Sequence, residues 1–165
     1  MTFVIDPAAP QLPHRGAPPL VTAPSPGHAF PHQQLTQNAP PSLQEELYAR
    51  AAALPGVRVA DSYVSVPGSR AFHLDPDLAN GPADAYQSET EFAHLHPAGD
   101  GSLHMTLPPA VYHEAQEKEW GQPHPISGTM LVFGPRDTVE LEIVWQMLLT
   151  SYRFAVGEWL TAAAE

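Results

Sequence analysis

Residues 91–107 decide the fold of this chain, and they read EFAHLHPAGDGSLHMTL. Two alternating runs flank a Gly-Asp-Gly turn, which is the pattern of an antiparallel hairpin. The apolar set is Ala93, Leu95, Leu103, Met105 and Leu107, and the other set is Phe92, His94, His96, His104 and Thr106. Because residues i and i+2 of a strand share a face, the pattern predicts three histidines on the face opposite the apolar side chains.

The length of the turn sets the register of this hairpin. A three-residue loop over 99–101 keeps all three histidines on one face and places His96 opposite His104. A two-residue loop over 100–101 would shift the pairing by one and turn His104 toward the apolar face. The hydrophobic pattern favours the longer loop. The same alternation predicts Glu91 on the face opposite the histidines.

The flanking sequence predicts two further strands before the hairpin and one after it. Residues 57–66 alternate and are rich in β-branched side chains, residues 70–74 read as their partner, and residues 130–133 read as a short buried strand. The segment between Trp120 and Ile126 reads as irregular. The expected fold class is α+β, a mainly antiparallel sheet of about five strands packed against two or three helices.

Apolar residues at helical spacing predict those helices. Their expected ranges are residues 42–54, 109–119 and 137–160. Ser42 with Glu45, and Asp137 with Glu140, have the spacing of a capping box. Pro109 suits the first position of the middle helix.

The chain divides into a proline-rich tail, residues 1–41, and a single domain, residues 42–165. Ten of the 20 prolines and only two charged side chains lie in the tail. Proline removes backbone donors and fixes φ, so the tail is expected to be disordered or polyproline-like, or to wrap the domain. Its histidines are His14, His28 and His32, to which we assign no function.

The charge balance excludes several classes of partner. The chain of 165 residues holds 18 acidic and 7 basic side chains, for a net charge of -11. This argues against nucleic-acid binding and against docking on an anionic membrane. The chain has no cysteine, which excludes disulfides and thiolate chemistry. It also shows no signal peptide and no apolar run long enough to span a bilayer, so we expect a cytoplasmic protein.

Three imidazoles on one sheet face suit metal ligands, a general base with helpers, or a polar wall around a ligand. His124, held between two prolines, is a fourth candidate. Arg136 precedes the last helix and could pair with a substrate enolate or with a structural carboxylate. No carboxylate stands at a recognised ligand spacing, so no metal is expected. If one binds, its ligands are His94, His96 and His104.

Several segments, taken in order, resemble the luciferase domain of bioluminescent fungi and of the bacterial and fungal proteins that share it. These segments are residues 91–97, 100–104, 120–121, 124–125, 134–137 and 151–155. The resemblance covers roughly residues 57–157. It departs at the N-terminus, where fungal luciferases carry a hydrophobic anchor and this chain carries its proline-rich tail.

Fungal luciferase oxidises 3-hydroxyhispidin, a styryl-pyrone, with molecular oxygen and without an organic cofactor. The resemblance therefore implies an oxygen-dependent enzyme for a small enolic or aromatic substrate such as a hydroxypyrone. Molecular oxygen is the co-substrate, a bound divalent metal stays open, and light emission is not part of the expectation. The expected catalytic residues are His94, His96, His104, His124 and Arg136, with Phe92, Thr106 and Trp120 as substrate contacts. The alternatives are a non-catalytic small-molecule-binding module and a metal-dependent enzyme that uses the histidine cluster.

Overall fold

The computed structural model describes residues 3–6, 8–23 and 32–158. These residues form one six-stranded sheet and three α-helices, which confirms the predicted α+β class with one strand more than expected. In chain order the elements are α1 (Pro41–Ala52), β1 (Val57–Asp61), β2 (Arg70–Leu74), β3 (Glu91–Leu95), β4 (Leu103–Met105), α2 (Pro109–Glu117), β5 (Gly121–Pro123), β6 (Met130–Val132) and α3 (Thr138–Val156). Two short 3-10 turns lie at Pro76–Leu78 and Ala83–Ala85.

The sheet is antiparallel throughout, in the order β1-β2-β3-β4-β6-β5. The strand that the sequence did not predict is β5, which lies in the segment expected to be irregular. It lies at the sheet edge, where a proline such as Pro123 is tolerated. A Cβ added to Gly121 would lie 2.7 Å from the Leu131 carbonyl oxygen, so only glycine permits this close pairing.

The β3–β4 hairpin keeps the predicted parity but not the predicted register. His94 pairs with His104, and the His96 amide donates to the Ser102 carbonyl at 3.0 Å. The loop therefore spans residues 97–101 rather than 99–101. It is closed by the amides of Asp100 and Gly101, which both donate to the Pro97 carbonyl. Since the shift is an even number of residues, the histidines stay on one face.

A β-bulge at the start of β3 overturns the predictions for Glu91 and Phe92. The register changes from Phe72 opposite Ala93 to His73 opposite Glu91, which leaves Phe92 as the extra residue. A bulge interrupts the alternation of side chains. The Phe92 ring therefore packs in the core, with centroids 6.3 Å from Phe72 and 5.8 Å from Tyr152. Glu91 lies beside the histidines instead of opposite them.

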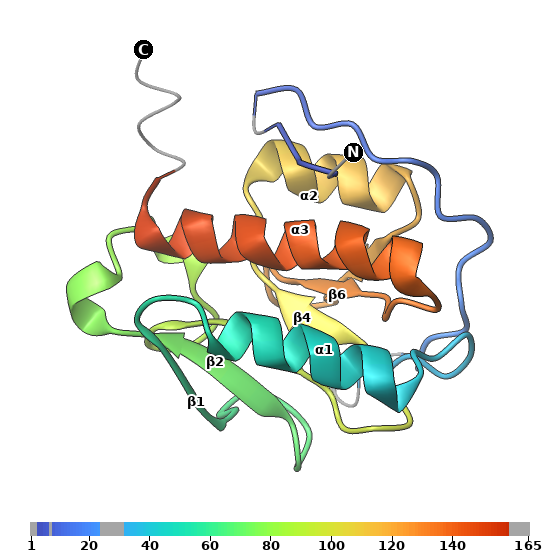
Figure 1. The fold of residues 1–165 in the computed structure, drawn as a ribbon, viewed down its shortest axis with the longest axis horizontal. Coiled ribbons are helices and arrows are strands. Elements are labelled where there is room, and N and C mark those ends of the chain that lie inside the picture. Colours follow the sequence, from blue (N-terminus) through green and yellow to red (C-terminus); the bar gives the residue numbers. More distant parts are fainter. Residues whose placement is uncertain (1–2, 7, 24–31, 159–165) are drawn as a thin grey trace.

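Figure 1 shows the three helices in front of the sheet, with α3 between α1 and α2. The Asp137 side chain accepts from the Glu140 amide at 2.8 Å and so caps α3 as predicted. The Ser42–Glu45 capping box is wrong, because α1 already begins at Pro41. Helix α3 ends at Val156, earlier than expected, where Gly157 adopts a φ of 94°. Residues 159–160 of the predicted helix lie outside the described residues.

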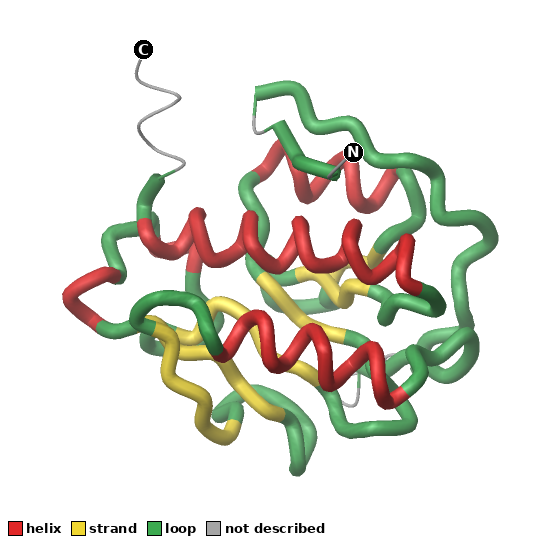
Figure 2. Tube along the Cα trace, in the orientation of Figure 1, coloured by secondary structure: helices red, strands yellow, loops and turns green. Residues whose placement is uncertain are grey.

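The described part of the proline-rich segment lies against the domain and is irregular, as Figures 1 and 2 show. Ile5 and Leu12 are buried in the core. The Arg15 amide donates to the Lys118 carbonyl at 2.9 Å, and His32 is buried. Of the other tail histidines, His14 is exposed and His28 lies outside the described residues. Within the described ranges, no helix has both the length and the apolar character needed to cross a membrane.

Candidate functional site

Three buried histidines meet at the β3–β4 hairpin. His94 lies on β3, His104 lies opposite it on β4, and His96 follows the last residue of β3. The Nδ1 atom of His104 is 3.1 Å from Nε2 of His94 and 3.0 Å from Nε2 of His96. The hairpin thus turns one nitrogen of each ring toward the other two.

Acidic and hydroxyl groups lie behind two of these rings. Nδ1 of His96 is 2.9 Å from a carboxylate oxygen of Asp100 and 3.0 Å from the Ser102 hydroxyl. Nδ1 of His94 is 3.6 Å from a carboxylate oxygen of Glu91. Asp100 lies in the hairpin loop, and its other carboxylate oxygen accepts from the Ser102 amide at 3.0 Å. It therefore stabilises the loop as well as contacting His96.

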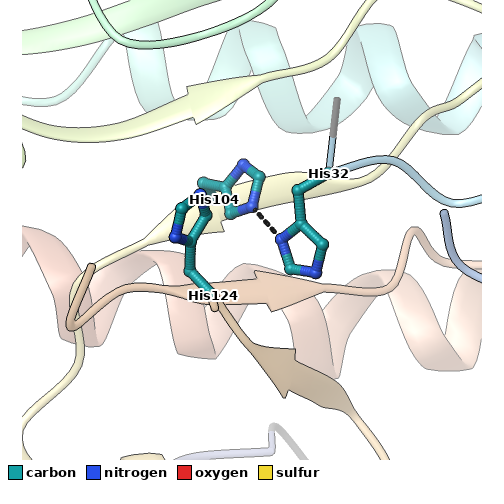
Figure 3. A group of neighbouring side chains, drawn as sticks. All are labelled: His32, His104 and His124. Carbon is teal, nitrogen blue, oxygen red and sulfur yellow. Dashed lines mark hydrogen bonds between the residues drawn. The ribbon is translucent and has the colours of Figure 1, made fainter. Parts of the chain in front are cut away.

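Two histidines from other segments extend the cluster. Nδ1 of His32 is 2.8 Å from Nε2 of His104, and the two rings stack with centroids 5.0 Å apart. His124 follows β5, and its ring meets His32 edge-on at 5.2 Å and His104 at 5.4 Å. Figure 3 shows His32 and His124 approaching His104 from two different segments. His124, a candidate from the sequence, thus lies beside the hairpin histidines, and so does His32, to which no function had been assigned.

Burial shifts the titration of this cluster toward the neutral ring. Burial, together with the neighbouring histidines, holds the pKa of His104 well below its usual value. Burial also lowers the pKa of His94, although the Glu91 carboxylate acts in the opposite direction. Burial and then repulsion from His124 lower the pKa of His32 to about 4, and burial lowers the pKa of His124. These four imidazoles are therefore uncharged at neutral pH.

A cavity of about 690 Å³ opens beside the cluster. Its lining residues are Val64, Ala83, Asp84, Tyr86, Gln87, His94, His104, Thr106, Leu107, Pro109, Tyr112, His113, His124, Ile126, Ser127, Gly128, Thr129 and Phe154. Small-molecule pockets have volumes of about 300–1,000 Å³. Thr106 is among the lining residues and His96 is not. The aromatic lining residues were not predicted, because they come from a loop and two helices that meet only in the fold.

Three predicted site residues lie away from the cavity. Phe92 belongs to the core. Trp120 is buried, and its indole donates to the Pro13 carbonyl at 2.6 Å.

Arg136 is the third predicted site residue that lies away from the cavity. Its guanidinium meets Glu140 at 2.6 Å and the Arg15 carbonyl at 3.1 Å, and the hydrogen bonds to Glu140 raise its pKa. Arg136 is therefore not among the residues that line the cavity, and the catalytic role expected of it stays a prediction. Arg136 links the start of α3 to the proline-rich segment, because its guanidinium donates both to Glu140 of α3 and to the Arg15 carbonyl.

Two groups of three histidines bring possible metal-ligand atoms within 4.8 Å of one another. One group is His94, His96 and His104, and the other is His32, His104 and His124. Both include His104, whose two nitrogens face in different directions. Among the described residues, the arrangement offers neutral imidazoles that can accept a proton, donate a hydrogen bond or bind a cation.

The comparisons with known proteins agree with the motifs of the sequence. The family model of the Luciferase domain matches residues 89–151. This range runs from just before β3 into α3 and includes the four histidines that the sequence singled out. A search of curated proteins and a search of solved structures each found no match. The chain therefore contains a luciferase-like domain, as its resemblance predicted.

Proposed function

We propose that this chain is an oxygen-dependent enzyme that acts on a small enolic or aromatic substrate, such as a hydroxypyrone, without an organic cofactor. The observation that carries the proposal is the wall of neutral histidines, His94, His104 and His124, along the cavity. The luciferase-like domain supports the same class of chemistry.

The lining of the cavity suits a planar ring. Tyr86, Tyr112 and Phe154 provide aromatic surface, against which a pyrone or phenol ring can pack at offset-stacked or edge-on geometry. Thr106 lies among them, and its hydroxyl donates to the Ala85 carbonyl at 2.9 Å. This hydrogen bond fixes the threonine oxygen on the cavity wall, where it can accept a hydrogen bond from the substrate.

The histidines can divide the proton chemistry between them. A neutral imidazole on the wall, His94 or His104, can accept the proton of the substrate enol. Nδ1 of His124 accepts from the amides of Ile126 and Ser127 at 3.2 and 3.0 Å. In the neutral ring this leaves the proton of His124 on Nε2, so that His124 acts as a donor and can stabilise the enolate oxygen.

The enolate is the species that meets oxygen. Its α-carbon supplies the electron pair that forms the carbon–oxygen bond, and molecular oxygen is reduced to the level of a peroxide. The enol proton resides meanwhile on the histidine and returns to the reduced oxygen. Atoms and electrons balance without another reductant, because the substrate itself is oxidised.

The experiment is to incubate the purified, untagged chain with 3-hydroxyhispidin in air and under nitrogen. Oxygen uptake and substrate loss are measured together. We expect both in air, neither under nitrogen, and a strong reduction in the His104→Gln variant but not in His14→Gln, whose histidine is exposed and is not among the residues that line the cavity. A substrate that raises the melting temperature but is recovered unchanged would overturn the enzymatic proposal in favour of a binding module. No binding and no loss would overturn the hydroxypyrone assignment.

A further inference from the structure

We propose that His94, His96 and His104 form a binding site for one divalent transition-metal ion, of the kind that prefers imidazole ligands. This goes beyond the proposed reaction, because metal binding can be measured without any substrate. An ion on these nitrogens would take the place of the proton that His94 or His104 accepts in that reaction. Zinc, iron, cobalt, nickel and copper ions all accept imidazole nitrogen, and their affinities follow the usual order along the series.

Two of the three pairs of inner nitrogens have the separation that a shared ion requires, and all three ligand atoms lie within 4.8 Å of one another. The pair from His94 and His104 is 3.1 Å apart, and the pair from His104 and His96 is 3.0 Å apart. Three nitrogens bound at roughly 2.1 Å to one ion are separated by roughly 3.0–3.4 Å, depending on its geometry. A neutral imidazole carries one ring proton, so if that proton is on the outer nitrogen of each ring, all three converging nitrogens present lone pairs.

Each of the three rings has a partner at its outer nitrogen. Glu91 lies 3.6 Å from Nδ1 of His94, and Asp100 lies 2.9 Å from Nδ1 of His96. Nε2 of His104 lies 2.8 Å from Nδ1 of His32. Metal-binding histidines almost always donate their other N–H to a carboxylate, carbonyl or similar acceptor, which fixes the tautomer and turns the lone pair toward the metal. His96 fits this pattern through Asp100, and His104 fits it through the Nδ1 atom of His32. For His94, Glu91 lies just beyond hydrogen-bond distance, and Nδ1 is also 3.5 Å from the Ser62 hydroxyl.

The buried carboxylates of Glu91 and Asp100 behind the rings also favour a bound cation. Glu91 is 0% exposed, and among the described residues no hydrogen-bond donor meets either of its carboxylate oxygens. Asp100 is 8% exposed. Burying carboxylates without a compensating cation is costly. A dication among the three rings would offset this cost, because it polarises the N–H groups that face the two carboxylates.

The second group of histidines is less suited to a metal. Nδ1 of His124 already accepts from two backbone amides, which places its ring proton on Nε2. The Nδ1 atom of His32 contacts Nε2 of His104, the outer nitrogen of an inner-site ligand. Two of the inner ligands, His94 and His104, also line the cavity. An ion held by these three ligands would have room for a further ligand, as in three-ligand catalytic sites.

The test measures metal bound by the untagged full chain in the absence of substrate. The protein is stripped with a chelator, dialysed, and titrated with Zn²⁺ and with Co²⁺, whose visible absorption reports its coordination. We expect about one ion per chain and a melting temperature higher by several degrees at saturation. Elemental analysis of the protein as purified identifies the ion it carries.

Two variants and a matched control locate the site. His96→Gln removes one ligand and should abolish the Co²⁺ absorption, whereas His14→Gln, which removes an exposed histidine, should bind as the unmodified chain does. Asp100→Asn keeps the oxygen that accepts from Ser102 but removes the charge behind His96, and should weaken metal binding about 10–100-fold with unchanged stoichiometry. No stoichiometric binding by the folded unmodified chain would overturn the proposal. Equal binding by the His96→Gln and His14→Gln variants would overturn it as well. Should His96→Gln fail to fold, the unmodified chain and Asp100→Asn still decide.

Discussion

The two faces of the β3–β4 hairpin are both buried, but they are built from opposite kinds of side chain. One face carries Ala93, Leu95 and Met105 into the apolar core. The other carries His94 and His104 into a network of ring nitrogens. The same pleat produces both, because successive side chains alternate. The apolar face stabilises the fold by removing surface from water, whereas the histidine face has a desolvation cost that only its partners offset. The residues that stabilise the core and the residues proposed for chemistry thus lie on opposite faces of the same two strands.

The largest expected effect is on the histidine face. His104→Gln should lower kcat/KM for the oxidation of a hydroxypyrone about 10²–10⁴-fold, the usual contribution of proton transfer by a positioned side chain. Steady-state oxygen uptake measures it, with circular dichroism to show that the variant is folded. If a folded His104→Gln variant keeps full activity, the histidine face has only a structural role and the proposed difference in function between the two faces is wrong.

The apolar face should respond in the complementary way. Phe92→Ala removes a fully buried ring that packs on Phe72 and Tyr152, and it should lower the free energy of unfolding by about 3–5 kcal/mol. Urea denaturation measures this change. Phe92→Leu, which keeps most of the volume, is the control and should cost less. A Phe92→Ala protein of unchanged stability but weakened substrate binding would instead place Phe92 at the cavity.

Removing a bound metal ion tests whether the histidine face of the hairpin contributes to stability. Chelation should lower the stability of the unmodified chain by about 2.7 kcal/mol relative to protein held at 100 times the dissociation constant. Thermal unfolding with and without Zn²⁺ gives the difference. The His14→Gln variant should show the same loss and His96→Gln none. An equal response of all three proteins would mean that the ion acts elsewhere.

The smallest effect is expected at Arg136, which touches neither face of the hairpin. Its ion pair with Glu140 is partly exposed, and pairs of that kind contribute about 0–1 kcal/mol. Arg136→Gln should therefore reduce stability by less than about 1 kcal/mol and leave oxygen uptake within the error of the assay. A loss of activity comparable with that of His104→Gln would instead support the catalytic role predicted for Arg136.

Local pattern was sufficient for much of the molecule. Alternation and turn residues predicted the central hairpin, the α+β class and the shared face of its three histidines. The Asp137 cap was also predictable, because a cap depends on residues three positions apart. Prediction failed wherever a neighbour in space decided the outcome. Strand β5 forms because β6 offers it an edge, and the bulge at Phe92 depends on how β3 meets β2.

The sequence by itself determined which side chains alternate, and therefore that three histidines of the hairpin lie together. Only the tertiary structure decided what stands behind them. Glu91 reaches His94 through a bulge, and His32 reaches His104 from 72 positions away. The physical reason is that alternation is a property of one strand, whereas the partners of a buried nitrogen come from whichever segments the packed chain brings within hydrogen-bond distance.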